Sequence, residues 1–149
     1  VGHEMDQGYR NTLKQLATDK GIAENIIFMD FVPDPQRLMQ LCDCSVLATY
    51  EDTFGLVLPE AMRAGVAVIG SNSGGVPEII KHGETGLLFD SGDANSLCNQ
   101  IMLLAKNPEK RSKIAVNGKQ DADSRFNTDD HFSQLQQLIS ITTDKPITG

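Results

Sequence analysis

Short apolar runs alternate with stretches of helical periodicity along this chain. The apolar runs that predict buried strands cover residues 26–29, 44–48, 66–70 and 87–89. Apolar residues at helical spacing, or a proline or acidic residue in the first turn, predict helices over residues 9–20, 93–106, 108–120 and 129–141. Shorter helices are expected after Pro35 and over residues 76–80. This order of elements predicts a layered α/β domain with a mostly parallel sheet.

The amino terminus fits the end of an interrupted element. Val1 and Gly2 look like the last residues of a strand followed by a turn, so the first strand is expected to be truncated. No internal repeat or low-complexity run divides the chain. We therefore expect one domain over residues 1–141 and a frayed, flexible tail over residues 142–149.

The charge balance of the chain is acidic. Its 149 residues include 13 Lys and Arg against 20 Asp and Glu, which gives a formal net charge of -7. An acidic surface repels phosphate backbones, which argues against nucleic acid as a partner. No run approaches the ~20 apolar residues of a membrane span, and the first residues lack the features of a signal peptide. These observations predict a soluble chain.

Three cysteines, Cys42, Cys44 and Cys98, form an odd and sparse set for a chain of this length. A disulfide scaffold uses an even and denser pattern, so a reducing compartment is expected. The Cys-x-Cys spacing differs from the usual zinc pattern, which also needs a second ligand pair. We expect no metal site and interpret these thiols as buried structural groups.

Residues 50–65 follow a predicted strand and become a helix. Pro59 fits only in the first turns of that helix, which should therefore begin near Gly55 or Leu56. The amides of Gly55, Leu56 and Val57 then lie in the first turn, where N–H groups without a helical partner favour an anion such as phosphate. Glycine at position 55 would keep the approach to these amides open.

Two acidic residues flank the start of this helix, Asp52 in the preceding loop and Glu60 in the first turns. Both would face the carboxyl end of a parallel sheet, where open α/β sheets form their ligand crevice. Carboxylates accept paired hydroxyl hydrogen bonds, so a sugar diol is a natural ligand. Each acid also has a structural interpretation: Glu60 complements the helix dipole, and Asp52 is a turn or capping residue. Taken alone, the two interpretations of Glu60 are even, and the structural one is favoured for Asp52.

A second glycine loop, Gly74 and Gly75, stands between a predicted strand and the short helix at 76–80. The pair fits close approach of a ligand to the backbone, and it fits a tight strand-to-helix turn equally well. Neither glycine loop contains the G-x-G-x-x-G of dinucleotide dehydrogenases or the G-x-x-x-x-G-K-[ST] of P-loop enzymes. Both of those classes are excluded.

Taken in order, these motifs resemble the retaining glycosyltransferases of family 4, also called glycosyl transferases group 1. The family's acid-x7-acid motif matches residues 52–60 and continues to residue 65. Gly-Gly-Val-Pro-Glu-Ile-Ile at 74–80 and Gly-Glu-Thr-Gly-Leu-Leu at 83–88 match the motifs that follow. The resemblance implies the carboxy-terminal, donor-binding half of a GT-B fold: a Rossmann-like parallel sheet flanked by helices, with its first strand truncated.

The resemblance also implies roles for the candidate residues. Glu60 would bind the ribose hydroxyls of a nucleotide-sugar donor, and Asp52 would reach hydroxyls of the transferred sugar; these two form the candidate catalytic pair. Other donor contacts would come from Phe54, Gly55, Leu56, Val57, Gly74 and Gly75. The loop at 31–33 would lie near the nucleobase. No cofactor and no metal is implied beyond the donor substrate, which would be UDP- or GDP-linked.

The implied reaction transfers a hexose to a glycan or lipid-linked acceptor with retention at the anomeric carbon, as in cell-envelope or polysaccharide biosynthesis. The leaving diphosphate would be stabilised electrostatically. The parent enzyme is expected in the cytoplasm, and its association with the cytoplasmic face of a membrane stays open.

The sequence departs from the family pattern in two ways. The first motif acid is usually glutamate, whereas this chain has Asp52, whose shorter side chain would alter which sugar hydroxyl it reaches. The arginine and lysine that clamp the diphosphate in the family precede the match, as does the amino-terminal acceptor domain. Since half of an interdomain cleft cannot position an acceptor, this piece alone is expected to be inactive.

Two other functions stay open beside the transferase. A nucleotide-sugar epimerase of similar shape would need additional acids and histidines in the cleft, and no such cluster is present in the sequence. A non-catalytic nucleotide-sugar-binding or interaction module would tolerate the loss of Glu60. The presence of Glu60 together with Gly55 and the glycine pair therefore favours the transferase.

Overall fold

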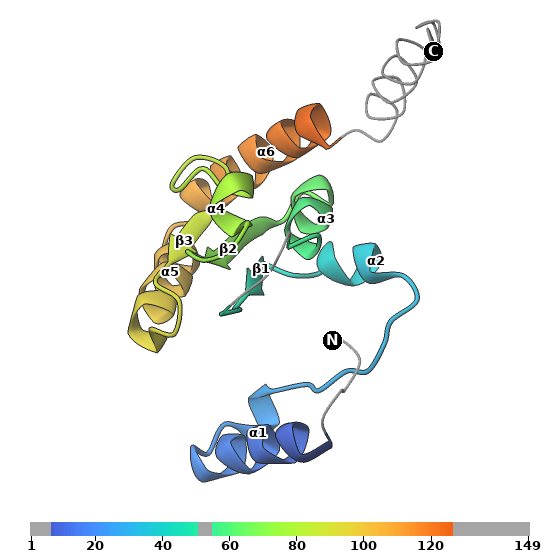
Figure 1. Cartoon of the computed structure of the whole chain (residues 1–149), viewed down its shortest axis with the longest axis vertical. Helices are drawn as coiled ribbons and strands as arrows, with labels where there is room; N and C mark the ends of the chain where they lie inside the picture. The colour runs from blue at the N-terminus through green and yellow to red at the C-terminus, as the bar shows by residue number, and fades with distance from the viewer. Residues whose placement is uncertain (1–6, 51–54, 127–149) are drawn as a thin grey trace, which may run out of the picture. The chain divides into compact units, whose positions relative to one another are not determined.

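The computed structural model describes residues 7–50 and 55–126 of the chain. The chain divides into two compact units, the first covering residues 1–35 and the second residues 36–149 (Figure 1). Each unit has its own internal packing.

Several predicted elements lie outside the described residues. They are the truncated strand at Val1 and Gly2, the helix over residues 129–141 and the tail over residues 142–149. Within the part of the chain that is described, no helix combines the length and the apolar composition that crossing a membrane requires.

The first unit is built on helix α1, Gln7–Asp19. Gly21 ends this helix with a positive φ of 66°, and the next amide, that of Ile22, donates to the carbonyl of Ala17 at 2.9 Å. A short 3-10 helix, η1, Ala23–Asn25, follows. The predicted first helix and its glycine stop are confirmed.

The strand predicted at residues 26–29 is wrong. Ile27 is 84% exposed, and no strand in the described ranges pairs with this segment. A strand is stable only when a neighbour takes up its backbone hydrogen bonds. The segment instead runs back along α1, where Arg10 forms an ion pair with Asp30 and donates to the Phe28 carbonyl at 3.4 Å.

A three-stranded parallel sheet forms the centre of the second unit, in the order β1-β2-β3 (Figure 1). The strands are β1 Cys44–Leu47, β2 Ala67–Ser71 and β3 Leu87–Phe89. The helices after α1 are α2 Pro35–Met39, α3 Val57–Arg63, α4 Val76–Ile79, α5 Ala94–Lys106 and α6 Pro108–Arg125. The predicted α/β fold with a parallel sheet flanked by helices is confirmed.

Apolar side chains pack on both faces of this sheet. Successive residues of a strand point to opposite faces, so Val68 belongs to one cluster while Ala67 and Ile69 belong to the other. The Val68 cluster also contains Leu58, Ala61, Met62, Val76, Ile79, Ile80 and Ala122. The opposite cluster also contains Leu87, Phe89, Leu104 and Ile114. All residues of β2 are buried, as expected for the central strand of a parallel sheet.

Helix α6 passes the turn between α4 and β3 at a glycine. A Cβ atom at Gly118 would stand 2.8 Å from the carbonyl oxygen of Thr85, closer than real Cβ contacts come. One residue earlier, the Asn117 side-chain amide donates to the Glu84 carbonyl at 3.2 Å. Glycine at position 118 therefore sets how closely α6 approaches this turn.

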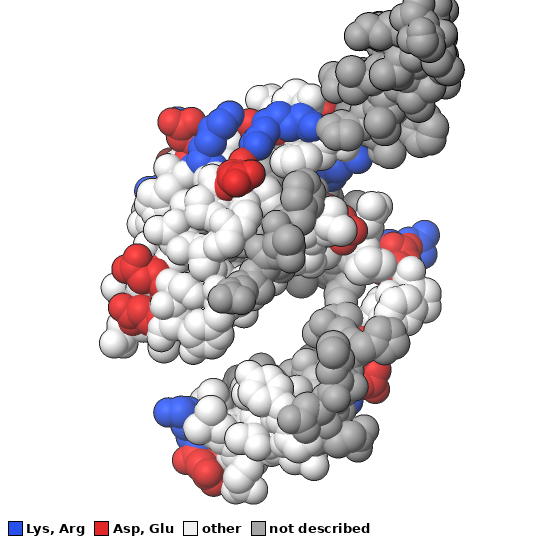
Figure 2. Space-filling view, viewed as in Figure 1, with Lys and Arg blue, Asp and Glu red and all other residues white. Residues whose placement is uncertain are grey.

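Asp121 joins α6 to the end of α4 through charged groups. Its carboxylate accepts hydrogen bonds from the Lys81 ammonium at 2.6 Å and from the Arg125 guanidinium at 2.8 Å. Arg125 also donates to the backbone carbonyls of Glu78 and Ile79. Burial alone would raise the pKa of Asp121, but the hydrogen bonds from Lys81 and Arg125 outweigh it and hold the pKa below its ordinary value. Figure 2 shows basic and acidic side chains interspersed over this part of the surface.

Acid should weaken this junction. A carboxyl group whose pKa is lower in the folded chain contributes stability above its unfolded pKa, about 3.9, and loses it as the pH falls through the folded value. We therefore expect the free energy of unfolding to fall as the pH drops below about 5, and Asp121→Asn to remove part of that fall. Denaturant unfolding across this pH range, with the exposed Asp90→Asn as control, measures it. Equal pH slopes for Asp121→Asn and the unmodified chain would contradict the expectation.

Candidate functional site

The three parallel strands end at one edge of the sheet, where the sequence predicts a ligand crevice. Three connections begin there: residues 48–56 after β1, residues 72–75 after β2 and residues 90–93 after β3. The described residues of the predicted donor site lie in the first two connections and in the first turn of α3. The parallel topology thus brings the two glycine loops to the same edge.

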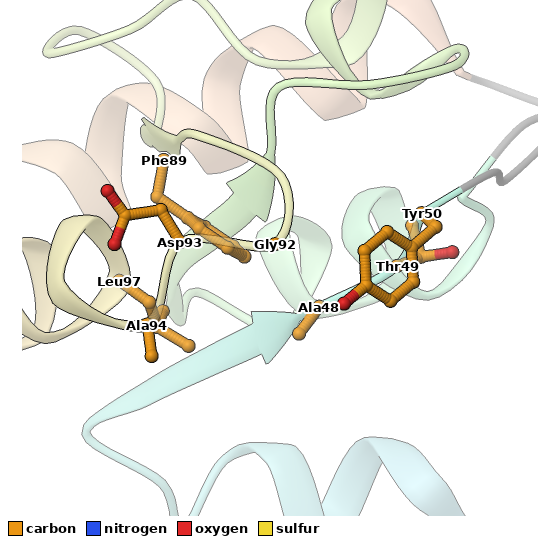
Figure 3. Close-up of a pocket in the computed structure, with 8 residues that line it drawn as sticks. All are labelled: Ala48, Thr49, Tyr50, Phe89, Gly92, Asp93, Ala94 and Leu97. Atoms are coloured by element: carbon orange, nitrogen blue, oxygen red, sulfur yellow. The ribbon is translucent and has the colours of Figure 1, made fainter.

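A cavity of about 180 Å³ opens at this edge, between the first and third connections. Its walls are formed by Ala48, Thr49, Tyr50, Phe89, Gly92, Asp93, Ala94 and Leu97 (Figure 3). Figure 3 shows Thr49 and Tyr50 on one side, at the end of β1, and Phe89 and Leu97 on the other. Pockets for drug-sized ligands start at roughly 300 Å³, so this cavity accommodates only part of a nucleotide sugar.

The third connection was not part of the predicted site. Gly92 has a positive φ of 81°, and a Cβ atom there would lie 3.2 Å from the Tyr50 ring. Asp93 accepts hydrogen bonds from the amides of Asn95 at 2.8 Å and Ser96 at 3.1 Å, which confirms the predicted acidic cap of α5. The sequence signal for this wall was a glycine between a strand and a helix cap.

Gly55 is buried and has a positive φ of 60°. A Cβ atom at this position would lie 3.3 Å from Leu47 Cδ2, 3.5 Å from Leu58 Cδ1 and 3.7 Å from Ile79 Cδ1. A side chain would therefore point into the core and not between the amides and a ligand. Backbone conformation and core packing explain the glycine, and the predicted reason, access to the amides, does not.

The start of α3 lies where the sequence predicts it, with Leu56 as the N-cap residue. The Leu58 amide donates to the Gly55 carbonyl at 2.9 Å, and the Glu60 amide donates to the Leu56 carbonyl at 3.3 Å. No carbonyl in the described ranges accepts from the amides of Leu56 and Val57, as is usual for a first helical turn. The Glu60 side chain is exposed and lies within one turn of these two amides.

The other two residues predicted in this segment, Asp52 and Phe54, lie outside the described residues. The spacing between the two acids, Asp52 and Glu60, therefore stays a sequence observation.

The glycine pair after β2 divides into two different cases. Gly74 has a positive φ of 55°, so the turn itself requires glycine there. Gly75 is the N-cap residue of α4 with a φ of −79°, a conformation open to any residue. The turn interpretation thus accounts for glycine at position 74. Backbone conformation does not explain why position 75 is also glycine.

Hydroxyl groups gather around the backbone N–H and C=O groups of Thr49. The Thr49 amide donates to Ser71 Oγ at 3.4 Å, and its carbonyl accepts from Ser73 Oγ at 3.2 Å and Ser91 Oγ at 3.1 Å. Ser71 is fully buried. We call Ser71, Ser73 and Ser91 the hydroxyl clamp. The sequence analysis missed it, although all three serines lie within three residues after the end of a predicted strand.

The cysteines differ from their predicted burial. Cys42 and Cys98 are exposed, and Cys44 is half-buried. Burial raises the pKa of the Cys44 thiol, and the neighbouring Asp43 carboxylate adds to this effect, so the thiol stays protonated and weakly nucleophilic. Short loops at the start of β1 and an exposed face of α5 hold the other two thiols at the surface. Among the described residues, no three His, Cys, Asp or Glu side chains gather to hold a metal ion.

The chain is similar to known proteins over most of its length. The family model of the glycosyl transferases group 1 matches residues 1–121. The N-acetyl-alpha-D-glucosaminyl L-malate synthase of Bacillus anthracis is 31% identical over 127 residues, which cover 85% of this chain and 33% of that protein. The D-inositol 3-phosphate glycosyltransferase of Corynebacterium efficiens is 30% identical over 141 residues, covering 93% of this chain and 33% of that protein.

Solved structures show the same fold. HepE of Anabaena in complex with UDP matches with a TM-score of 0.91 and 30% identity, over 94% of this chain and 39% of that chain. HepE in complex with UDP-glucose matches with a TM-score of 0.88 at the same identity, over 91% and 38%. This chain therefore spans between a third and two-fifths of the length of these relatives.

Proposed function

The chain belongs to the glycosyl transferases group 1 family, and from this membership we propose that it is the carboxy-terminal, donor-binding half of a retaining glycosyltransferase with the GT-B fold. The proposed donor is a UDP- or GDP-linked hexose, and the proposed acceptor is a glycan or a lipid-linked sugar. One observation carries the donor assignment: the fold match at a TM-score of 0.91 is to a protein whose crystals hold UDP. The proposed location of the parent enzyme is the cytoplasm.

Glu60 is the proposed contact for the ribose. Its exposed carboxylate lies within one turn of the start of α3, and two carboxylate oxygens can accept hydrogen bonds from two neighbouring hydroxyls. The amides of Leu56 and Val57 would donate to oxygens of the diphosphate or sugar. We assign Asp52 to hydroxyls of the transferred sugar.

Four more residues complete the proposed donor site. Gly75 has no backbone need for glycine, so close approach of the donor is the explanation that we propose for it. Its neighbour Gly74 makes the turn that presents it. Phe54 and Gly55 stand in the sequence between Asp52, the proposed sugar contact, and the start of α3. We therefore include both in the proposed donor site.

The proposed reaction breaks the bond between the anomeric carbon and the diphosphate oxygen and forms a bond from that carbon to the oxygen of an acceptor hydroxyl on the same face, whose proton passes to the leaving diphosphate. The diphosphate leaves with the bonding electrons, so hydrogen-bond donors that stabilise its growing negative charge lower the barrier. The acceptor must be held against the donor for this step. The acceptor domain is the proposed partner of this unit, without which it would bind donor and transfer nothing.

A nucleotide titration tests the proposal. We would follow the amides of Leu56, Val57 and Gly75 by nitrogen-proton NMR while adding UDP, GDP or ADP. One nucleotide should shift these amides, and Glu60→Ala should weaken its binding about 10- to 100-fold, the effect of losing hydrogen bonds to a charged group. Glu109→Ala is the matched control because Glu109 is an exposed acid in the first turn of another helix, α6. It should change the affinity less than about twofold.

Two results would count against this function. Binding that is unchanged in Glu60→Ala would remove Glu60 from the site. If a high concentration of nucleotide shifts none of these amides, this unit does not bind the donor by itself.

A further inference from the structure

The hydrogen bonds of the hydroxyl clamp form a closed ring with Thr49. Each serine hydroxyl carries one proton. Ser73 Oγ shares its proton between the Thr49 carbonyl oxygen and Ser71 Oγ, each of which lies 3.2 Å away. Ser71 in turn accepts from the Thr49 amide. Neighbouring hydrogen bonds polarise one another, and the full burial of Ser71 protects that part of the ring from water.

Main-chain pairing does not reach this point of the sheet edge. The last residue pair between β1 and β2 is Leu47 with Gly70, and Thr49 lies two residues beyond Leu47. The position of the Thr49 peptide relative to the other connections therefore depends on side-chain hydrogen bonds. The hydroxyl clamp supplies them from both sides, since Ser71 and Ser73 belong to the end of β2 and its connection and Ser91 to the connection after β3.

The clamp lies next to the glycines of the candidate donor site. Ser73 directly precedes Gly74 in a tight turn. In this turn the Ser73 amide donates to the Ser71 carbonyl at 2.8 Å, and the Val76 amide donates to the Ser73 carbonyl at 3.2 Å. Thr49 and Gly55 stand at the two described flanks of the first connection, and Gly55 is buried beside apolar side chains of the core. One flank is thus held by apolar packing and the other by three hydroxyls.

We propose that the hydroxyl clamp positions Thr49 and the connection after β2 for nucleotide binding, and that Ser73 and Ser91 are positioning residues that do not touch the ligand. The proposal rests on the proposed donor function of this edge. Loss of the Ser73 and Ser91 hydroxyls removes both side-chain donors to the Thr49 carbonyl and keeps the sheet, its core and the Ser71 side chain in place. Nucleotide affinity should then fall without a matching loss of folding stability.

The test compares the double variant Ser73→Ala/Ser91→Ala with the unmodified chain. UDP affinity is measured by the NMR titration above, and thermal unfolding is recorded for each variant. We expect the double variant to bind UDP about five- to tenfold more weakly, the effect of losing one or two neutral hydrogen bonds. The variant Ser73→Thr/Ser91→Ala keeps a hydroxyl at position 73 and should regain most of the affinity that the double alanine variant loses. Ser124→Ala removes an equivalent hydroxyl bond to a carbonyl in α6 and should leave UDP binding unchanged.

The outcomes separate this inference from the function on which it rests. If the unmodified chain does not bind UDP or another nucleotide, the donor function fails and the inference fails with it. If the unmodified chain binds and the double variant binds equally well, only the inference is overturned. It is also overturned if the loss of affinity is no greater than the loss of folding stability explains, or if Ser73→Thr/Ser91→Ala regains none of the affinity.

Discussion

Leu58→Ala should lower the free energy of unfolding by about 2–5 kcal/mol, the usual effect of emptying a buried leucine site. Leu58 is 0% exposed and belongs to the cluster on the Val68 face of the sheet. Its Cδ1 atom also lies within 3.5 Å of where a Cβ atom would stand at Gly55 and Gly70, so it packs directly against both glycines. The vacated space would therefore lie between the first turn of α3 and the central strand, where the sheet cannot collapse to fill it.

Leu56→Ala is the matched control for this measurement. It makes the same chemical change two residues earlier, at a side chain that is 65% exposed. Urea unfolding at neutral pH should show a change within about 0.5 kcal/mol for Leu56→Ala. Similar losses in the two variants would mean that the α3 start does not pack as described.

Gly55→Ala should destabilise the fold by about 1–2 kcal/mol from backbone strain alone, because an L-residue resists a φ of 60°. The new methyl group would also come within 3.3 Å of the Leu47 side chain, which adds a crowding term of about 1–3 kcal/mol if neighbours cannot move. Urea unfolding gives the sum of both terms. Because α3 follows directly, UDP affinity should fall in the same variant.

Gly65→Ala separates strain from crowding. Gly65 has a φ of 78° after the end of α3, but a Cβ atom there would meet nothing within 4 Å. Its loss should therefore be the strain term alone, about 1–2 kcal/mol. If the two variants lose equal free energy of unfolding, crowding at position 55 contributes nothing. If Gly55→Ala loses none, Gly55 does not have the left-handed conformation.

The elements that the sequence predicted correctly carry their signals locally. The glycine stop of α1, the acidic cap of α5 and the proline in the first turn of α3 each depend on residues within one turn. The strand predicted at 26–29 failed because its signal was only an apolar run. A run of this kind becomes a strand when a partner strand lies alongside, and the described chain supplies none.

The candidate site divides in the same way. The helix start at Leu56 and the position of Glu60 followed from Pro59 and the preceding glycine. The hydroxyl clamp and the cavity beside Tyr50 depend on which connections meet at the sheet edge, which only the strand order decides. Gly55 shows a third case, in which the structure gives a reason for glycine, a positive φ and a buried position, other than the one that the sequence predicted.

The close passage of α6 over the turn at Thr85 has a consequence for sequence change over evolutionary time. An α-helix turns by about 100° per residue, so one residue inserted between Pro108 and Gly118 would rotate a different side chain toward the Thr85 carbonyl. The length of this half of α6 is therefore under stricter selection than most of its surface residues. Among homologous sequences, insertions and deletions should be found before Pro108 or beyond the helix, and substitutions should accumulate at the exposed positions of the helix.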